Sequence, residues 1–282
     1  MPEEVLLEAR GLRVALPDRG SKRVFGRPPL IEILKGIDLS IGAGETVGLV
    51  GESGSGKSTL ARALLRLYPL SAGKIVFEGR DLSTLEESEL RPLRARMQIV
   101  FQDSQSALNP RLTIGSALAE PFLSYGRASG SREALRLAGG LLERVGLGAG
   151  MSGRYPHQLS GGQRQRVGIA RAMALQPALV VADEIVSGLD VSVQAQVLDL
   201  LRTLRAETGM ALVLISHDLS VVRALCERVV IMQHGLVVEA GVSETVFKDP
   251  QHPYTRKLLR AIPLPEVDSE WIDSVDIEEA TP

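Results

Sequence analysis

The sequence predicts an α/β protein built around a largely parallel β-sheet. Short runs of apolar and β-branched residues alternate with helical patterns along the chain. Three runs, at 97–101, 178–183 and 210–216, are apolar almost throughout, which is typical of buried parallel strands. Ligands of such sheets bind outside the carboxyl ends of the strands, so we expect one shared site at that edge. The polar residues that end these runs are Gln102, Asp183 with Glu184, and His217.

The segments around the predicted sheet have different characters. Residues 5–16 and 33–51 are typical of strands joined by Gly turns, and 228–241 of a hairpin that turns at His234-Gly235. Residues 103–176 are rich in Ala, Leu, Arg and Gly with helical spacing, which indicates a helical subdomain inserted between strands of the core. The stretch after Pro250 is acidic and interrupted by prolines, and we expect a loosely held tail there.

Composition excludes several classes of function. Aromatic residues make up 4% of the 282 residues and the net charge is −2, so neither base stacking nor nucleic-acid binding is favoured. Cys226 is the one cysteine, so a disulfide within the chain is impossible and a Cys-ligated metal site is unsupported. Its apolar surroundings predict a buried side chain. Arg91, Arg94 and Arg96 are expected to form a solvated basic face.

Nothing in the sequence predicts a membrane span. The N-terminus lacks a basic-then-apolar signal pattern, and the longest apolar runs fall far short of the roughly 20 residues that cross a bilayer. We therefore expect a cytosolic protein unless another component tethers it.

The segment GESGSGKS at 51–58 fits the phosphate-loop pattern G-x-x-x-x-G-K-[ST]. It follows an apolar strand and precedes a helical run. Glycines let backbone N–H groups approach phosphate oxygens, and a helix N-terminus favours negative charge. We expect Lys57 to reach the β- and γ-phosphates and the Ser58 hydroxyl to ligate Mg²⁺. The residues predicted to contact the nucleotide here are Gly51, Ser53, Gly54, Ser55, Gly56, Lys57, Ser58 and Thr59.

The strand at 178–183 supplies the expected partner of this loop. In phosphate-loop enzymes, an Asp at the end of a neighbouring strand holds Mg²⁺, commonly through water. Asp183 stands at that place. Glu184 is the next residue, and it is suitably placed to orient or deprotonate the attacking water.

The segment LSGGQ at 159–163 precedes a second helical run. Ser160, Gly161 and Gly162 would present hydroxyl and backbone N–H donors at the start of that helix. Two anion-binding helix starts in one chain indicate either two phosphate sites or one site shared by two copies.

LSGGQ resembles the signature of the ATP-binding-cassette (ABC) family more strongly than any other pattern. The resemblance implies a P-loop NTPase core of the ABC type, with an N-terminal antiparallel β-subdomain and an inserted helical signature subdomain. It implies that two cassettes pair head to tail and clamp ATP between one phosphate loop and the opposite signature. The residues whose roles it implies are Ser160, Gly161, Gly162 and Gln163 on ATP, Gln102 on Mg²⁺ and water, His217 on the γ-phosphate, and Asp190 in a loop at the dimer interface.

Longer stretches resemble a narrower group. VFQDSQSALNPR, RYPHQLSGGQRQRVGIARA and HPYTR are similar to the subunits that power dipeptide, oligopeptide and nickel importers, and the resemblance runs from about residue 4 to 263. It implies a nucleotide-binding domain at 1–248 and a C-terminal segment with an acidic tail at 249–282. It also implies a peripheral location on the cytoplasmic face of the cell membrane. The implied partners are a second, non-identical cassette, two transmembrane permease subunits and, indirectly, an extracytoplasmic solute-binding protein.

Three points stay open at this stage. A homodimer of cassettes is compatible with the sequence, because every catalytic position is intact. An exporter subunit and a soluble ABC ATPase that acts on ribosomes or DNA are the alternative functions. Many family members stack an aromatic residue on adenine, but Leu16 stands where a Tyr is usual, which leaves Phe25 as the candidate.

Overall fold

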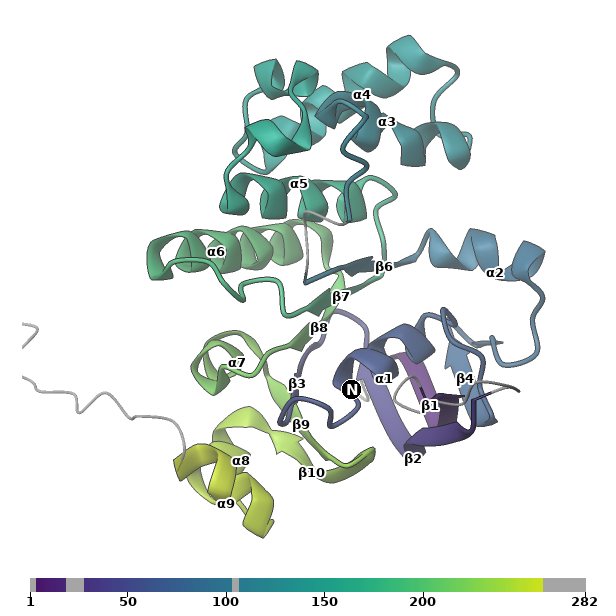
Figure 1. Ribbon diagram of the computed structural model, residues 1–282, viewed down its shortest axis with the longest axis vertical. Coiled ribbons are helices and arrows are strands. Elements are labelled where there is room, and N and C mark those ends of the chain that lie inside the picture. The colour runs from purple at the N-terminus through teal and green to yellow at the C-terminus, as the bar shows by residue number, and fades with distance from the viewer. Residues whose placement is uncertain (1–3, 19–27, 103–106, 261–282) are drawn as a thin grey trace, which may run out of the picture.

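The computed structural model describes residues 4–18, 28–102 and 107–260. A six-stranded sheet in the order β10-β9-β3-β8-β7-β6 lies at the centre of the fold (Figure 1). Its strands are parallel except β10, which pairs with β9 in the antiparallel direction. The strands are β3 (Thr46–Val50), β6 (Met97–Val100), β7 (Leu179–Asp183), β8 (Ala211–Ile215), β9 (Arg228–Gln233) and β10 (Leu236–Val242).

Every residue of β3, β7 and β8 is buried. A strand that is covered on both faces carries apolar residues at successive positions, because neither face meets water. Along β8, Val213 belongs to one core cluster and Leu212 to another, as expected when successive side chains point to opposite faces. The strands predicted at 97–101, 178–183 and 210–216 are therefore confirmed.

Different layers cover the two faces of the sheet. On one face, α1 packs through Leu60 and Leu64 together with a second, antiparallel sheet. On the other face, α6 and α7 pack through Leu201 and Val222. The helices around the sheet are α1 (Lys57–Leu64), α2 (Glu87–Arg94), α6 (Val191–Thr208), α7 (Leu219–Leu225), α8 (Ser243–Lys248) and α9 (Pro253–Arg260).

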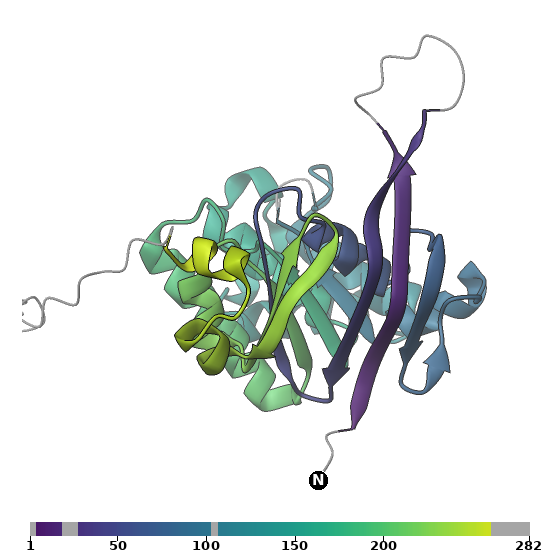
Figure 2. The same cartoon turned by 90° about the horizontal axis from the view of Figure 1, so that it is seen from below.

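The second sheet is the antiparallel subdomain that the family resemblance implies. Its order is β2-β1-β4-β5. The long strands β1 and β2 form a ribbon whose far end projects away from the rest of the fold (Figure 2). The strands of this sheet are β1 (Val5–Pro17), β2 (Leu30–Gly42), β4 (Ala72–Phe77) and β5 (Arg80–Asp81).

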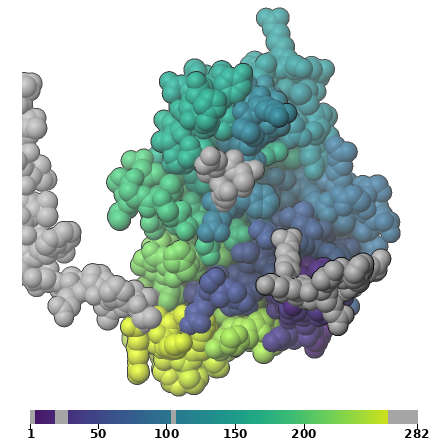
Figure 3. All heavy atoms as spheres, viewed as in Figure 1, coloured from purple at the N-terminus to yellow at the C-terminus, as the bar shows by residue number. Residues whose placement is uncertain are grey.

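The inserted helical subdomain has a core of its own, which includes Ile114, Leu118 and Leu142. α5 belongs to two cores at once, because Val167 packs in this cluster and Ile169 packs in the cluster beneath the sheet. The surface view shows the subdomain at one end of the molecule and α8 and α9 at the other (Figure 3). Its elements are α3 (Ile114–Ser124), α4 (Ser131–Arg144), the 3-10 helices η1 (Ala149–Gly153) and η2 (Pro156–Gln158), and α5 (Gly161–Met173).

Two expectations about single residues have opposite outcomes. Cys226 is buried as predicted, and burial raises the pKa of its thiol to about 12. The expectation of a solvated basic face is wrong for Arg94, whose guanidinium donates to the backbone oxygens of Leu65 and Arg66.

Among the residues that the structure describes, none forms a helix long and apolar enough to span a membrane.

The predicted hairpin turn at His234-Gly235 is present between β9 and β10. Both residues have positive φ, 49° and 81°, as a two-residue turn of this type requires. Gly235 also joins three parts of the fold, since its N–H donates to Ser55 O (3.0 Å) and its carbonyl accepts from Lys35 N (3.0 Å). A Cβ at this position would lie 2.1 Å from the carbonyl oxygen of Ile33.

We predict that Gly235→Ala destabilises the protein more than Gly79→Ala does. Gly79 also has positive φ, 74°, but an added Cβ there meets nothing within 4 Å. Gly79→Ala should therefore cost only the left-handed conformation, about 1 kcal/mol. Gly235→Ala adds a clash with backbone that cannot give way. Urea unfolding of both variants measures the difference, and equal midpoints would contradict the close approach to Ile33.

Candidate functional site

Polar side chains from separate strand ends meet at the carboxyl edge of the parallel sheet, as expected. β3 leads into the phosphate loop, β6 into Gln102, β7 into Glu184 and β8 into His217. The parallel register places these ends side by side, since Val100 pairs with Ala182 and Asp183 with Ile215. The edge that the sequence predicts as a shared site is therefore formed.

Lys57 is the first residue of α1, and its side chain lies inside the phosphate loop. It is 5% exposed. Its Nζ donates to Gly51 O at 2.7 Å and to Glu52 O at 2.9 Å. The ammonium group of Lys57 therefore joins the end of the loop to its beginning through hydrogen bonds to two backbone carbonyls.

Glycines give the phosphate loop its shape. Gly54 and Gly56 have φ of 80° and 105°. Gly51 has φ of 154°, and a Cβ there would lie 2.2 Å from the Met232 carbonyl oxygen. The loop therefore packs directly against the end of β9, and a side chain at Gly51 would force them apart.

Ser58 and Asp183, the two residues predicted to hold Mg²⁺ together with Gln102, are in direct contact. Ser58 Oγ donates to Asp183 Oδ1 at 2.9 Å. Arg62, one turn further along α1, places Nη2 3.9 Å from Asp183 Oδ2. Burial raises the pKa of Asp183, against the opposing effects of the Ser58 hydrogen bond and the Arg62 charge.

Glu184 links the ends of two other strands. Its Oε2 accepts from Gln102 Nε2 at 2.8 Å and lies 3.8 Å from His217 Nδ1. Glu184 has φ of 49°, which is uncommon for a residue with a side chain. Such conformations are strained and persist where the surrounding structure enforces them, often at functional sites. Here the Glu184 N–H is fixed by Ile215 O at 3.0 Å.

Lys57 interacts electrostatically with Asp183 and Glu184. Burial lowers the pKa of Lys57, while the charges of Glu184 and Asp183 act in the opposite direction. The site therefore holds a buried cation beside two carboxylates, one of them almost fully buried. A polyanion bound with a divalent cation matches this arrangement in charge.

The donor types at this edge fit Mg²⁺. Ser58, Asp183 and Gln102 offer hydroxyl, carboxylate and amide oxygens, and Mg²⁺ is commonly held by one or two carboxylates with phosphates and water. The described residues contain no cluster of three or more His, Cys, Asp or Glu that could hold a metal by themselves.

The signature residues form the start of α5. Ser160 Oγ accepts from Gln163 N at 3.3 Å, and Gln163 Oε1 accepts from Ser160 N at 3.0 Å, so the two side chains cap the helix reciprocally. Ser160 is exposed. Gly162 is buried against α6, where a Cβ would lie 2.3 Å from Val193 Cγ1. Ser160 is the N-cap of α5, and α5 lies well apart from α1 (Figure 1), so the signature and the phosphate loop belong to separate helix starts.

The loop at 187–190 runs from the acidic pair toward the signature. Asp190 caps α6, because its Oδ1 accepts from Val193 N at 2.9 Å and from Ser192 Oγ at 2.7 Å. These hydrogen bonds lower the pKa of Asp190. Leu189 reaches Gly161, where an added Cβ would lie 3.4 Å from Leu189 Cδ2. Phe25, the candidate for adenine stacking, lies outside the described residues.

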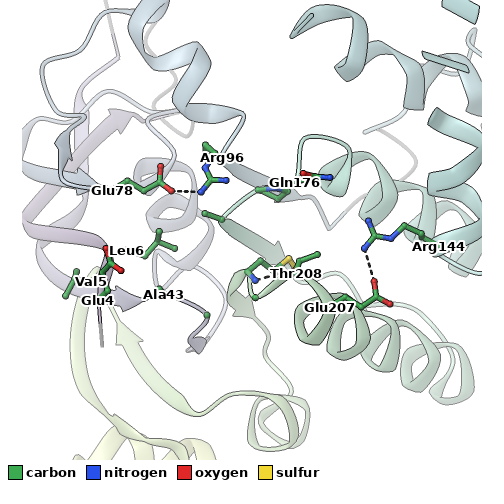
Figure 4. Close-up of a pocket in the computed structure, with 15 residues that line it drawn as sticks. Glu4, Val5, Leu6, Ala43, Glu78, Arg96, Arg144, Gln176, Glu207 and Thr208 are labelled. Atoms are coloured by element: carbon green, nitrogen blue, oxygen red, sulfur yellow. Dashed lines mark hydrogen bonds and ion pairs between the residues drawn. The ribbon is translucent and has the colours of Figure 1, made fainter. Parts of the chain in front are cut away.

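A large cleft in the described part of the chain lies elsewhere. It has a volume of about 860 Å³ and lies at the amino ends of the strands, opposite the phosphate loop. Two ion pairs border it, Arg96 with Glu78 (2.7 Å) and Arg144 with Glu207 (2.8 Å) (Figure 4). None of the residues predicted to bind ATP or Mg²⁺ lines this cleft.

Two contacts of the site were missed by sequence reasoning. Arg62 is four residues after Ser58 on the same helix, and this spacing could have indicated that it shares a face with the loop. Tyr254 reaches the phosphate loop from a distance of 202 residues along the chain. No local pattern signals that contact.

Comparison with known families agrees with these features. Residues 34–187 match the ABC transporter family. Residues 238–282 match the family described as the C-terminal region of oligopeptide/dipeptide transporters.

Curated relatives are similar over most of the chain. The probable peptide ABC transporter ATP-binding protein y4tS of Sinorhizobium fredii is 50% identical over 84% of this chain and 67% of its own length. The oligopeptide transport ATP-binding protein OppF of Escherichia coli is 42% identical over 98% of this chain and 83% of its own length. The glutathione import ATP-binding protein GsiA of Salmonella typhi is 47% identical over 93% of this chain, which spans 42% of GsiA.

Solved structures share the fold. The dimeric cassette MJ0796 in a post-hydrolysis state, bound to ADP and Pi, has a TM-score of 0.73 and 30% identity, covering 84% of this chain and 98% of its own. The cbiO1 structure from Clostridium perfringens, part of the ABC transporter complex cbiONQ, has a TM-score of 0.73 and 26% identity, covering 93% and 97%. The predicted fold class is confirmed, and the chain belongs to the ABC transporter family as one of its ATP-hydrolysing cassettes.

Proposed function

We propose that this cassette binds ATP and Mg²⁺ at the carboxyl edge of its parallel sheet and hydrolyses ATP together with a second cassette. One observation carries the proposal. Ser58 of the phosphate loop donates to Asp183, and the charge of Glu184 acts on Lys57 at that edge, whereas Ser160 begins α5, which lies apart from α1. A chain built in this way holds two half-sites, and a partner cassette is needed to complete each.

The residues divide the chemistry between them. Lys57 Nζ reaches the β- and γ-phosphates, and N–H groups of the loop and of the α1 start bind phosphate oxygens. Ser58, Asp183 and Gln102 would hold Mg²⁺, which would neutralise part of the phosphate charge when bound. Glu184 orients the attacking water and accepts its proton, and His217 contacts the γ-phosphate. The partner's γ-phosphate is met by Ser160, Gly161, Gly162 and Gln163, next to Asp190 in the interface loop.

We propose that the cassette pair drives import of peptides or other small solutes through separate membrane subunits. The names of the relatives, which concern peptide, oligopeptide and glutathione import, support this direction of transport. So does the C-terminal match to oligopeptide/dipeptide transporters. In this proposal the chain is peripheral, on the cytoplasmic face of the cell membrane, and its partners are a non-identical cassette, two permease subunits and, indirectly, a solute-binding protein. No observation favours the exporter or the soluble ATPase.

The C-terminal segment at 249–282 is proposed as a part with its own role, attached to the nucleotide-binding domain at 1–248. The described portion of this segment packs against the core of the nucleotide-binding domain. Tyr254 is buried in the core cluster beneath the sheet, with Leu258 and Leu259 packed against it. A role for this segment can therefore be exerted directly on the core.

We predict that Glu184→Gln retains ATP binding and nearly abolishes turnover. The amide keeps the size of the side chain but cannot accept a proton, and loss of a general base costs about 10²-fold or more. Phosphate release and equilibrium ATP binding measure the two properties. The control is Glu207→Gln, at the opposite edge of the sheet, which should turn over normally. Turnover of Glu184→Gln within about twofold of wild type would refute its role.

We predict that Ser160→Arg impairs hydrolysis of the ATP held by the opposite cassette and leaves ATP binding to its own phosphate loop nearly intact. A bulky cation at the start of α5 blocks the partner's γ-phosphate. Ser131→Arg, at the start of α4, is the matched control. If the isolated Ser160→Arg subunit instead loses ATP affinity to the same extent as turnover, Ser160 belongs to the site of its own chain.

We predict that the complex isolated from membranes in mild detergent contains this chain, a different cassette and two permease subunits. Quantitative mass spectrometry of the purified complex gives the composition. Two copies of this chain without a second cassette would refute the hetero-pair. A complex without permease subunits would favour the soluble ATPase, and the transport proposal would fail.

A further inference from the structure

The first turn of α9 touches the phosphate loop. The backbone N–H of Glu52 donates to the Tyr254 hydroxyl at 2.9 Å. Tyr254 is 5% exposed, so water does not replace the tyrosine oxygen readily. In the described part of the chain, Glu52 N–H is the one backbone N–H of the phosphate loop that donates to a residue of the C-terminal segment.

The core holds α9 in place for this contact. Glu239 on β10 accepts from Gln251 N at 2.8 Å and from His252 N at 3.0 Å. His252 Nδ1 in turn accepts from Tyr254 N at 3.2 Å, which satisfies an N–H at the start of the helix. The position of the tyrosine hydroxyl is therefore set by β10, a strand of the central sheet.

The contact fixes a whole peptide plane. The Gly51–Glu52 peptide is planar and trans, so its N–H and its C=O point in opposite directions. Its N–H points to Tyr254, and its carbonyl, Gly51 O, accepts from Lys57 Nζ at 2.7 Å. Because Gly51 has no side chain to restrict its backbone, the orientation of this plane depends on these two hydrogen bonds. Tyr254 thus sets the direction in which the lysine finds its acceptor.

We propose that Tyr254 is a positioning residue for ATP binding, which acts by fixing the Gly51–Glu52 peptide and through it Lys57. The proposal rests on the proposed role of Lys57 as a phosphate ligand. Tyr254 does not touch the phosphates in this arrangement. It keeps the loop in the shape that receives them, and it makes the C-terminal segment part of the ATP site.

The test is Tyr254→Phe in the full chain, which removes one oxygen and keeps the ring that packs in the core. Loss of a buried hydrogen-bond partner corresponds to about a five- to tenfold change in an equilibrium constant, so we expect ATP affinity to weaken by that factor. The KM for ATP should rise to the same extent, and kcat should stay within about twofold, because Glu184 is not moved. Both are measured well below the melting temperature of the variant.

A spectroscopic readout locates the effect. In ¹H–¹⁵N spectra, the Glu52 amide of Tyr254→Phe should shift and exchange faster with solvent, while amides of β7 keep their protection. Lys257→Ala is the matched control. It removes an ion pair of 3.3 Å to the Glu52 carboxylate, with both side chains more than half exposed, and should change ATP affinity less than twofold.

Glu239→Gln gives a second, independent variant, since it loosens the start of α9 without altering Tyr254 or the loop. It should raise KM in the same direction and by a smaller factor. The proposal is overturned if Tyr254→Phe keeps wild-type ATP affinity and KM, if kcat falls at unchanged KM, or if neither variant folds. Lys57→Ala separates the two claims: undiminished ATP affinity in that variant would refute the proposed phosphate site itself.

Discussion

The arrangement of the site follows from a constraint on the phosphate loop: a loop that offers its N–H groups to a ligand must find partners for its carbonyls. The structure meets this requirement from several directions. Gly51 O and Glu52 O accept from Lys57, and Ser55 O accepts from Gly235 in the β9–β10 turn. Gly56 O accepts from Leu60 within α1. The loop is thus shaped by its lysine, by a hairpin far along the chain and by the helix that follows it.

The same packing sets the charges of the site. Lys57 and Asp183 are both almost fully buried. Burial lowers the pKa of the lysine and raises that of the aspartate, so each charged form is opposed by desolvation and favoured by the charge of the other. A buried charge pair of this kind adds little to stability, because desolvation offsets the attraction. Its value lies in holding an ammonium group and a carboxylate at fixed positions in the proposed phosphate site.

Much of the fold could be predicted because its signals are local. The buried strands at 178–183 and 210–216 are apolar throughout, and the turn at His234-Gly235 needs residues that accept positive φ. The predicted site residues of the described part lie on the expected loops and helix starts for the same reason. The contacts that were missed depend on distant parts of the chain. Arg94 satisfies backbone carbonyls at the end of α1, and Tyr254 satisfies an N–H of the loop.

The phosphate-loop edge and the signature, which we propose to be two half-sites, are connected through a short path of packed residues. Glu184 O accepts from Ser187 N at 3.1 Å, so the acidic pair fixes the beginning of the loop that leads to Asp190. Leu189 in this loop lies against Gly161, at the start of the signature helix. α5 then continues into both the core beneath the sheet and the core of the helical subdomain. Because these cores are close-packed, a displacement of the signature helix relative to the sheet would disturb both the packing of α5 and the approach of Leu189 to Gly161. The residues between Glu184 and Asp190 are therefore one route by which the geometry of one proposed half-site can depend on that of the other.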